Sequence, residues 1–213
     1  MTTIPWYFDP ISPFAYLAWK RLQALNLDST VQPRPILFAG LLDHHGNVGP
    51  AEIPSKRRFT YRMVQWRAEQ QRVELNFPPS HPFNPLPALR LVIAAGASAE
   101  AVSTLLDFVW AAGRDPSQPA EIAELSRALG IADPAAAISD PQVKQRLRDN
   151  FEAAVSDQVF GVPTVVFRGN LYWGDDSVDM LATALANPER FESSPYSDVD
   201  SLPIGIARKT SAT

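Results

Sequence analysis

One side-chain hydroxyl, that of Ser12, stands where an expected strand gives way to an expected helix. Apolar side chains alternate over residues 4–8, which is typical of a strand, and Asp9-Pro10 ends it. Ser12 then occupies an N-cap position, and Pro13 suits the first helical residue because its missing N–H would be unpaired there. A helix N-terminus offers free N–H groups and partial positive charge to an anion. Ser12 is therefore either a helix cap or a donor to a bound anion, and for an isolated Ser-Pro the cap is favoured.

The composition restricts the chemistry in which this hydroxyl can take part. The chain of 213 residues contains no cysteine, which excludes a disulfide, a thiolate nucleophile of its own and a Cys-ligated metal. The formal net charge is −4 and there is no run of basic residues, which argues against nucleic acid as a partner. His44 and His45 are neighbours in an expected loop, where consecutive side chains rarely converge on one ion, so no metal site is expected.

The same composition favours a cytoplasmic protein. Hydrophobic residues make up 46% and charged residues 20% of the chain, which is ordinary for a soluble globular protein. No segment approaches the roughly 18 uninterrupted apolar residues of a membrane span, so no membrane partner is expected. The first residues also lack the charged and apolar regions of a secretory signal.

The first 40 residues have the pattern of a βαβ unit. Apolar residues keep helical spacing from residue 13 to about residue 26, and residues 31–38 are expected to form a second strand. Pro33 and Pro35 restrict that strand to an edge or to a short paired stretch. Two strands separated by one helix predict a parallel pair with a right-handed crossover.

Helical signals dominate the middle of the chain, and strand signals return only near its end. After a loop at residues 43–50, helices are predicted over residues 54–72, 86–97, 99–112, 121–129, and after Asp133-Pro134 and Asp140-Pro141. Residues 163–167 and 171–173 are expected to form a hairpin, followed by a helix over residues 178–186. This order predicts an α/β fold: a βαβ…ββα domain (residues 1–40 and 157–190), an all-helical insertion (residues 41–156) and a tail (residues 191–213).

With Gly161-Val162-Pro163 before the third strand, this order resembles the thioredoxin fold, in which a proline at this place is cis and faces the active site. A more specific resemblance covers residues 4 to about 186. Six motifs together resemble the 2-hydroxychromene-2-carboxylate isomerase family, which is close to the kappa-class glutathione transferases and the disulfide-oxidoreductase A superfamily. The motifs are Phe8-Asp9-x-x-Ser12-Pro13-Phe14-x-Tyr16-Leu17, Gly46-Asn47, Pro54-x-Lys56, Asn84 to Arg90, Gly161-Val162-Pro163-Thr164 and Trp173-Gly174-x-Asp176.

This resemblance implies that glutathione is the cofactor. Ser12 stands where disulfide oxidoreductases of this fold carry their first cysteine, so its implied role is to stabilise the glutathione thiolate. The main chain of Val162, beside Pro163, would pair with the tripeptide as an added strand. Lys56 and Asn47 are the candidates for binding the glycyl carboxylate.

The γ-glutamyl end of glutathione carries a carboxylate and an ammonium group. The N-terminus of the last helix suits the carboxylate, and Asp176 suits the ammonium group, whereas a plain N-cap is the alternative for Asp176. Asp175 is the other candidate cofactor-binding residue here. The sequence departs from the family pattern at Asp175, where a neutral residue is common, and at Ser177, where relatives often carry Arg. A second negative charge would repel the γ-glutamyl carboxylate.

The implied reaction converts 2-hydroxychromene-2-carboxylate to trans-o-hydroxybenzylidenepyruvate in the breakdown of naphthalene-like aromatics. The thiolate would add to the conjugated substrate, allow rotation about the former double bond and then leave, so that glutathione is recovered. The implied assembly is a homodimer. Trp66 and Phe83 are candidates for the pocket wall, although core positions are favoured for both. Asn84 either binds a substrate oxygen or caps the helix that begins near Leu86, and the cap is favoured.

Two other functions use the same predicted site. A kappa-like glutathione transferase or peroxidase would direct the thiolate at another electrophile, and a non-catalytic module would bind glutathione alone. The absence of cysteine excludes a dithiol oxidoreductase. A serine hydrolase fits poorly because the sequence has no G-x-S-x-G elbow.

Overall fold

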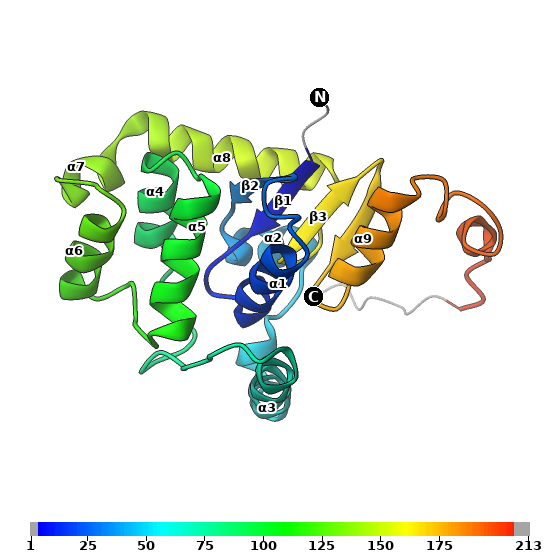
Figure 1. The fold of residues 1–213 in the computed structure, drawn as a ribbon, viewed down its shortest axis with the longest axis horizontal. Coiled ribbons are helices and arrows are strands. Elements are labelled where there is room, and N and C mark those ends of the chain that lie inside the picture. Colours follow the sequence, from blue (N-terminus) through cyan, green and yellow to red (C-terminus); the bar gives the residue numbers. More distant parts are fainter. Residues whose placement is uncertain (1–3, 207–213) are drawn as a thin grey trace.

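A four-stranded mixed sheet lies at the centre of the chain in the computed structural model, which describes residues 4–206 (Figure 1). The strands, in the order β2-β1-β3-β4 across the sheet, are β1 (Ile4–Phe8), β2 (Val31–Pro35), β3 (Thr164–Phe167) and β4 (Asn170–Trp173). β1 and β2 are parallel, and the other two pairs are antiparallel. The predicted βαβ…ββα order is therefore confirmed.

The helices follow the predicted order with one addition. They are α1 (Pro13–Ala24), α2 (Phe38–His45), α3 (Pro54–Gln71), α4 (Leu86–Ala94), α5 (Ala99–Leu106), α6 (Pro119–Ala128), α7 (Pro134–Ser139), α8 (Pro141–Ser156) and α9 (Val178–Ala186). Short turns of other helix types occur at Pro50–Glu52, Asp107–Ala111 and Ser197–Ser201. The predicted helix over residues 99–112 is α5 continued by the π-helical turn Asp107–Ala111.

The second strand is shorter than predicted, because β2 ends at Pro35 and helix α2 begins at Phe38. The apolar run over residues 36–38 reads as strand by composition alone. In the structure Leu37 is the extended N-cap residue of α2 instead. β2 lies at an edge of the sheet, as its two prolines require.

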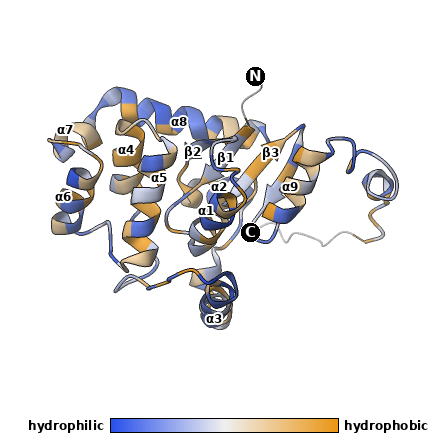
Figure 2. Cartoon of the chain, viewed as in Figure 1, coloured by the Kyte–Doolittle hydropathy of each residue, from blue (hydrophilic) through white to orange (hydrophobic). Residues whose placement is uncertain are grey.

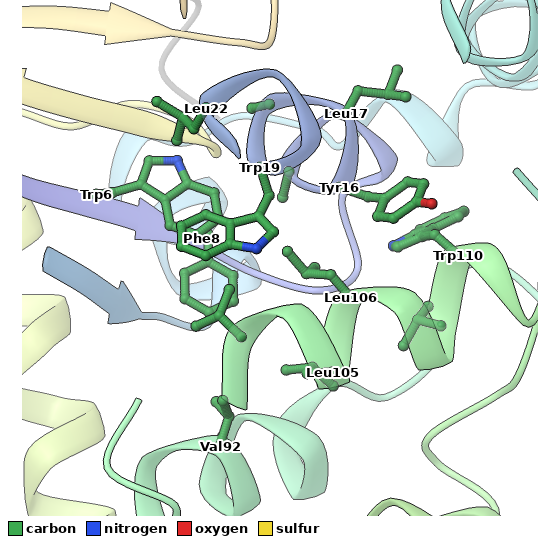
Figure 3. Close-up of a cluster of buried hydrophobic side chains, with 14 of the residues drawn as sticks. Trp6, Phe8, Tyr16, Leu17, Trp19, Leu22, Val92, Leu105, Leu106 and Trp110 are labelled. Atoms are coloured by element: carbon green, nitrogen blue, oxygen red, sulfur yellow. The ribbon is translucent and has the colours of Figure 1, made fainter. Parts of the chain in front are cut away.

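The two faces of β1 contribute to different cores. Trp6 and Phe8 stack with ring centroids 4.6 Å apart, and Trp19 of α1 lies 4.9 Å from Trp6 (Figure 3). Tyr7 points to the opposite face and packs with residues of α2 and α8, among them Leu41 and Ala154. The alternation predicted over residues 4–8 therefore supports a sheet covered on both sides. Figure 2 shows that β3, which pairs with β1, is also strongly hydrophobic.

Helix α3 lies apart from the other helices, below α1 in Figure 1, and packs against α1 along a narrow stripe. Its buried residues are Val64 and Ala68, whereas Phe59 is 61% exposed and Trp66 is 56% exposed. The expected core position for Trp66 is therefore wrong. The buried residues of α3 are thus small, whereas Phe59 and Trp66 lie on its exposed side. Phe83 is 7% exposed, which confirms its expected core position.

The division into a thioredoxin-like domain and a helical insertion stays a prediction. The structure describes the predicted tail, residues 191–213, only as far as residue 206. At the start of this tail, Phe191 packs on Tyr172 of β4. None of the helices within residues 4–206 is both long and apolar enough to cross a membrane.

Candidate active site

Ser12 lies at the junction of β1 and α1, with 9% of its surface exposed. It occupies the N-cap position of α1, but its side chain accepts no capping hydrogen bond. Its hydroxyl instead donates to the carbonyl oxygen of Val162 at 3.3 Å, which is long for an O–H···O bond. Ser98 at the start of α5 differs, because its Oγ accepts from the N–H of Ala101 at 3.2 Å. The expected side-chain cap at Ser12 is therefore absent, and its hydroxyl faces the segment that precedes β3.

That segment contains the cis peptide bond between Val162 and Pro163. The carbonyl oxygen of Pro163 accepts a hydrogen bond of 2.9 Å from the N–H of Gly174, just after β4. A side chain at Gly161 would place its Cβ 2.6 Å from Nε1 of Trp173, so only glycine permits this close approach. The N-terminus of α1, the cis-proline segment and the end of β4 therefore meet at one edge of the sheet.

Asp9 fixes the loop that carries Ser12. Its buried carboxylate accepts hydrogen bonds from the N–H of Ile11 at 2.9 Å and from the N–H of Phe38 at 2.8 Å. Burial raises the pKa of this carboxyl group to about 7, and the two N–H donors oppose that rise. The loop is thus tied to the first residue of α2.

Two side chains from the middle of the chain hold the carbonyl groups of the same loop. Trp110 donates its indole N–H to the carbonyl oxygen of Pro10 at 2.8 Å. Nε2 of His81 lies 2.7 Å from the carbonyl oxygen of Ile11, and Nδ1 lies 2.5 Å from the hydroxyl of Tyr61. Because a carbonyl oxygen only accepts, Nε2 carries the proton and Tyr61 donates to Nδ1.

Helix α3 supports His81 through a second contact. Arg57 donates to the carbonyl oxygen of His81 at 2.7 Å and to the hydroxyl of Tyr61 at 3.1 Å. Burial lowers the pKa of the His81 imidazole below its usual range, so the ring is neutral at pH 7. These contacts connect α3 to the residue before Ser12.

A charged cluster lies where β4 leads into α9. Asp175 is 4% exposed, and its Oδ2 lies 2.8 Å from Nε of Arg67 and 3.0 Å from Nε2 of Gln71. Burial raises the pKa of the Asp175 carboxyl group, and the Arg67 guanidinium opposes that rise. Asp176 is exposed, with its Oδ2 3.5 Å from Nη1 of the same arginine. The alternative role of Asp176 as an N-cap is wrong, since Ser177 is the N-cap residue of α9.

The structure therefore brings some of the predicted site residues together and leaves others apart. Ser12, Val162 and Pro163 are in one cluster, and the hydrogen bond from Gly174 to Pro163 brings the residues after β4 beside it. Asn47 and Lys56 are exposed, and within residues 4–206 no hydrogen bond or ion pair joins their side chains to this cluster.

Asn84 has the structural role that the sequence favoured. Its Oδ1 accepts from the N–H of Leu86 at 3.1 Å, at the first residue of α4. This contact satisfies an N–H group at the start of α4, as the favoured interpretation required, although the N-cap residue itself is Pro85. Binding of a substrate oxygen by Asn84 stays a prediction.

Sequence reasoning missed the contributions of Arg67, His81 and Trp110. His81 lies within the proline-rich stretch, where no periodic pattern marks a residue as buried or exposed. Trp110 is 100 residues from Pro10 and reads as an ordinary core residue. Arg67 reads as part of the solvated side of a polar helix. In the described part of the chain, no three His, Asp or Glu side chains gather in a way that could hold a metal ion.

Comparison with known proteins gives consistent similarities over most of the chain. The model of the DSBA-like thioredoxin domain family matches residues 3–186. The 2-hydroxychromene-2-carboxylate isomerase of Pseudomonas putida is 31% identical over 195 residues, which cover 85% of this chain and 93% of that protein. Glutathione S-transferase kappa 1 of Homo sapiens is 24% identical over 204 residues, which cover 86% of this chain and 90% of that protein. A solved 2-hydroxychromene-2-carboxylate isomerase superposes with a TM-score of 0.74 at 29% identity, covering 94% of this chain and 100% of that one.

Proposed function

Because the chain belongs to the DSBA-like thioredoxin domain family, and within it to the 2-hydroxychromene-2-carboxylate isomerases, it is an isomerase, and we propose that its cofactor is glutathione. In this proposal the substrate is 2-hydroxychromene-2-carboxylate or a similar intermediate of aromatic breakdown. The observation that carries the proposal is the position of Ser12. Its hydroxyl lies at a helix N-terminus beside a cis-proline segment, in a chain without a thiol.

Ser12 and the N-terminus of α1 would together stabilise the glutathione thiolate. A favourable helix end contributes up to about 2 kcal/mol to an anion. A hydrogen bond to a charged group contributes about 1.5–3 kcal/mol. Since one pKa unit corresponds to about 1.4 kcal/mol, the two effects lower the thiol pKa from about 8.5 to below 7. The bound thiol would then be mostly ionised at neutral pH.

The long hydrogen bond to Val162 suggests how the site changes when glutathione binds. The hydroxyl of Ser12 would turn from the carbonyl oxygen of Val162 to the sulfur atom, exchanging a weak neutral hydrogen bond for a charge-assisted one. The freed carbonyl and the N–H of Val162 would then pair with the cysteinyl residue of glutathione as an added strand. Asp176 would bind the γ-glutamyl ammonium group, and Lys56 with Asn47 would bind the glycyl carboxylate.

The reaction follows from a reversible carbon–sulfur bond. The hemiketal ring of the substrate first opens: the bond between the ring oxygen and the carbon that carries the hydroxyl group breaks, and the proton of that hydroxyl group ends on the ring oxygen, which gives a phenol and a conjugated ketone. The thiolate then adds to the conjugated carbon chain, and the electron pair of its carbon–carbon double bond moves to the ketone oxygen. The former double bond is then single and rotates. When the electron pair returns, the double bond re-forms in the other geometry and the carbon–sulfur bond breaks. Glutathione leaves unchanged, with no other reactant consumed.

A kappa-like glutathione transferase is the second candidate, because the similarity to the human kappa enzyme covers 86% of this chain, as much as the similarity to the isomerase does. The two functions differ in what happens to glutathione. We expect calorimetry to detect glutathione binding, and turnover of 2-hydroxychromene-2-carboxylate to leave the glutathione concentration constant. Consumption of glutathione in proportion to product would identify a transferase. Absence of binding heat at millimolar glutathione would contradict the cofactor itself. The pathway, the homodimer and the cytoplasmic location stay predictions.

A further inference from the structure

A pocket of about 620 Å³ is lined by residues of α1, α3 and the start of α9. Side chains of both charge signs line it, together with the exposed Trp66. The charged residues are Lys20, Arg21, Arg67, Asp175, Asp176 and Asp179. The pocket adjoins the proposed glutathione site, because Asp175 follows Gly174, whose N–H donates to the carbonyl oxygen of Pro163 at 2.9 Å.

Several of these charges have ion-pair partners. Lys20 pairs with Asp107 at 2.6 Å. Arg21 pairs with Asp179 at 2.6 Å. Arg67 is different, because it contacts two carboxylates, and its Nε lies 2.8 Å from Oδ2 of Asp175. Its other ion-pair contact is the looser one of 3.5 Å between Nη1 and Asp176.

The buried carboxylate of Asp175 orients the guanidinium group of Arg67. Asp175 is 4% exposed, and Gln71 donates to the same Oδ2 that receives Nε of Arg67. The side chain of Arg67 itself is 23% exposed and lines the pocket. Within residues 4–206, no hydrogen bond from its Nη2 is found, so this nitrogen can donate to a ligand.

A cation and an anion thus stand side by side at one end of the pocket. Arg67 offers a planar, permanently charged donor, and the exposed Asp176 offers a carboxylate 3.5 Å away. This pair complements a zwitterionic α-amino acid group, whose carboxylate and ammonium lie on one carbon atom. The contact of 3.5 Å is loose enough for a ligand to replace it with two charge-assisted hydrogen bonds.

We infer that Arg67 binds the α-carboxylate of the γ-glutamyl residue, while Asp176 binds its ammonium group. This inference rests on the proposed function and identifies Arg67 as the residue that makes the site specific for a free amino acid end. It also assigns Asp175 a positioning role, because Asp175 contacts Arg67 rather than the ligand.

The test compares glutathione with an analogue that lacks only the α-carboxylate, 4-aminobutyryl-cysteinyl-glycine. Calorimetry gives the Kd of both ligands for the wild-type protein and for Arg67→Ala. We expect Arg67→Ala to raise the Kd of glutathione by about 10- to 100-fold, the effect of one charge-assisted contact. The Kd of the analogue is expected to change less than about threefold, because the group that Arg67 binds is missing from it. Arg62→Ala, an exposed arginine on the same helix, is the control and should change neither value.

A second variant removes the risk that an unpaired buried Asp175 disturbs the fold. The double variant Arg67→Ala/Asp175→Asn takes away both charges and should show the same selective loss of glutathione binding. An equal loss for both ligands would overturn the inference, because Arg67 would then act only through the structure. If wild-type protein binds glutathione and the analogue equally well, the inference also fails while the cofactor proposal stands. If wild-type protein binds neither ligand at millimolar concentration, the cofactor proposal and the inference fail together.

Discussion

Replacing Ser12 with alanine separates a role in folding from a role in chemistry. Within residues 4–206 the hydroxyl makes one hydrogen bond, the 3.3 Å contact to the carbonyl oxygen of Val162, and it makes no capping bond. An ordinary hydrogen bond contributes about 0.5–1.5 kcal/mol, and a contact of this length belongs at the low end. We therefore expect Ser12→Ala to reduce the free energy of unfolding by less than about 1 kcal/mol.

The effect on bound glutathione should be much larger. A hydrogen bond to a thiolate contributes about 1.5–3 kcal/mol, which corresponds to roughly one to two pKa units. The helix N-terminus stays in place, because its N–H groups belong to the main chain. The pKa of the bound thiol should therefore rise by about one to two units, and kcat measured at a pH below both pKa values should fall roughly 10- to 100-fold, because the thiolate fraction there falls tenfold for each unit.

Two measurements and two control variants test this prediction. Ultraviolet absorbance of the thiolate, followed against pH, gives the pKa of the bound thiol, and urea unfolding gives the stability. Ser12→Thr keeps the hydroxyl and should keep much of the activity. Ser98→Ala removes a real cap and should cost about 1 kcal/mol of stability with kcat unchanged. The reasoning is refuted if Ser12→Ala leaves the thiol pKa at its wild-type value, or if activity falls only as far as stability does.

Three further substitutions test the surroundings of the site. Asp9 has a pKa raised to about 7, above its ordinary value near 4, so the folded protein holds a proton that the unfolded chain releases between these values. The free energy of unfolding should therefore fall as the pH rises from 4 to 7, and urea titrations of Asp9→Asn should lose this slope; an unchanged slope would exclude Asp9 as its source. His81→Phe should lower kcat about 10-fold by releasing the Ile11 carbonyl, and His81→Gln, which keeps an N–H donor, should recover much of it. Equal rates in the two variants would contradict this positioning role. Asp176→Asn should raise the KM for glutathione about 10-fold with kcat unchanged at saturation, and an unaltered KM would remove Asp176 from the site.

Local sequence signals predicted the elements whose boundaries depend on local chemistry. Asp133 and Asp140 each precede a proline, and each accepts a hydrogen bond at the start of its helix, from Ala136 at 2.9 Å and Gln142 at 2.7 Å. The hairpin between β3 and β4 turns at two residues with positive φ, Arg168 and Gly169. Such features are encoded within four residues of one another, so a single sequence is enough to find them.

Features that depend on contacts between distant elements could not be predicted in this way. The orientation of α3 is one, because its burial depends on where α1 lies and not on the apolar residues of α3 itself. The support of the Ser12 loop by His81 and Trp110 is another, since those side chains meet the loop only in the folded protein. Ser12 combines a feature that the sequence predicts with one that it does not. Its N-cap position was predicted correctly, whereas its hydrogen bond to Val162 crosses 150 residues of sequence.

Asp175 shows how one such contact changes a conclusion drawn from the sequence. From the sequence alone, we expect a second acidic residue next to Asp176 to repel the γ-glutamyl carboxylate. In the folded protein Asp175 is buried against Arg67, whose positive charge offsets its own, so the net charge of the cluster is that of Asp176 alone. The added acid therefore brings no net repulsion. A neutral residue in its place would leave the guanidinium group without its 2.8 Å contact, and the long arginine side chain would then lose conformational entropy on binding a ligand. The departure from the family pattern at Asp175 is thus consistent with glutathione binding once Arg67 is counted with it.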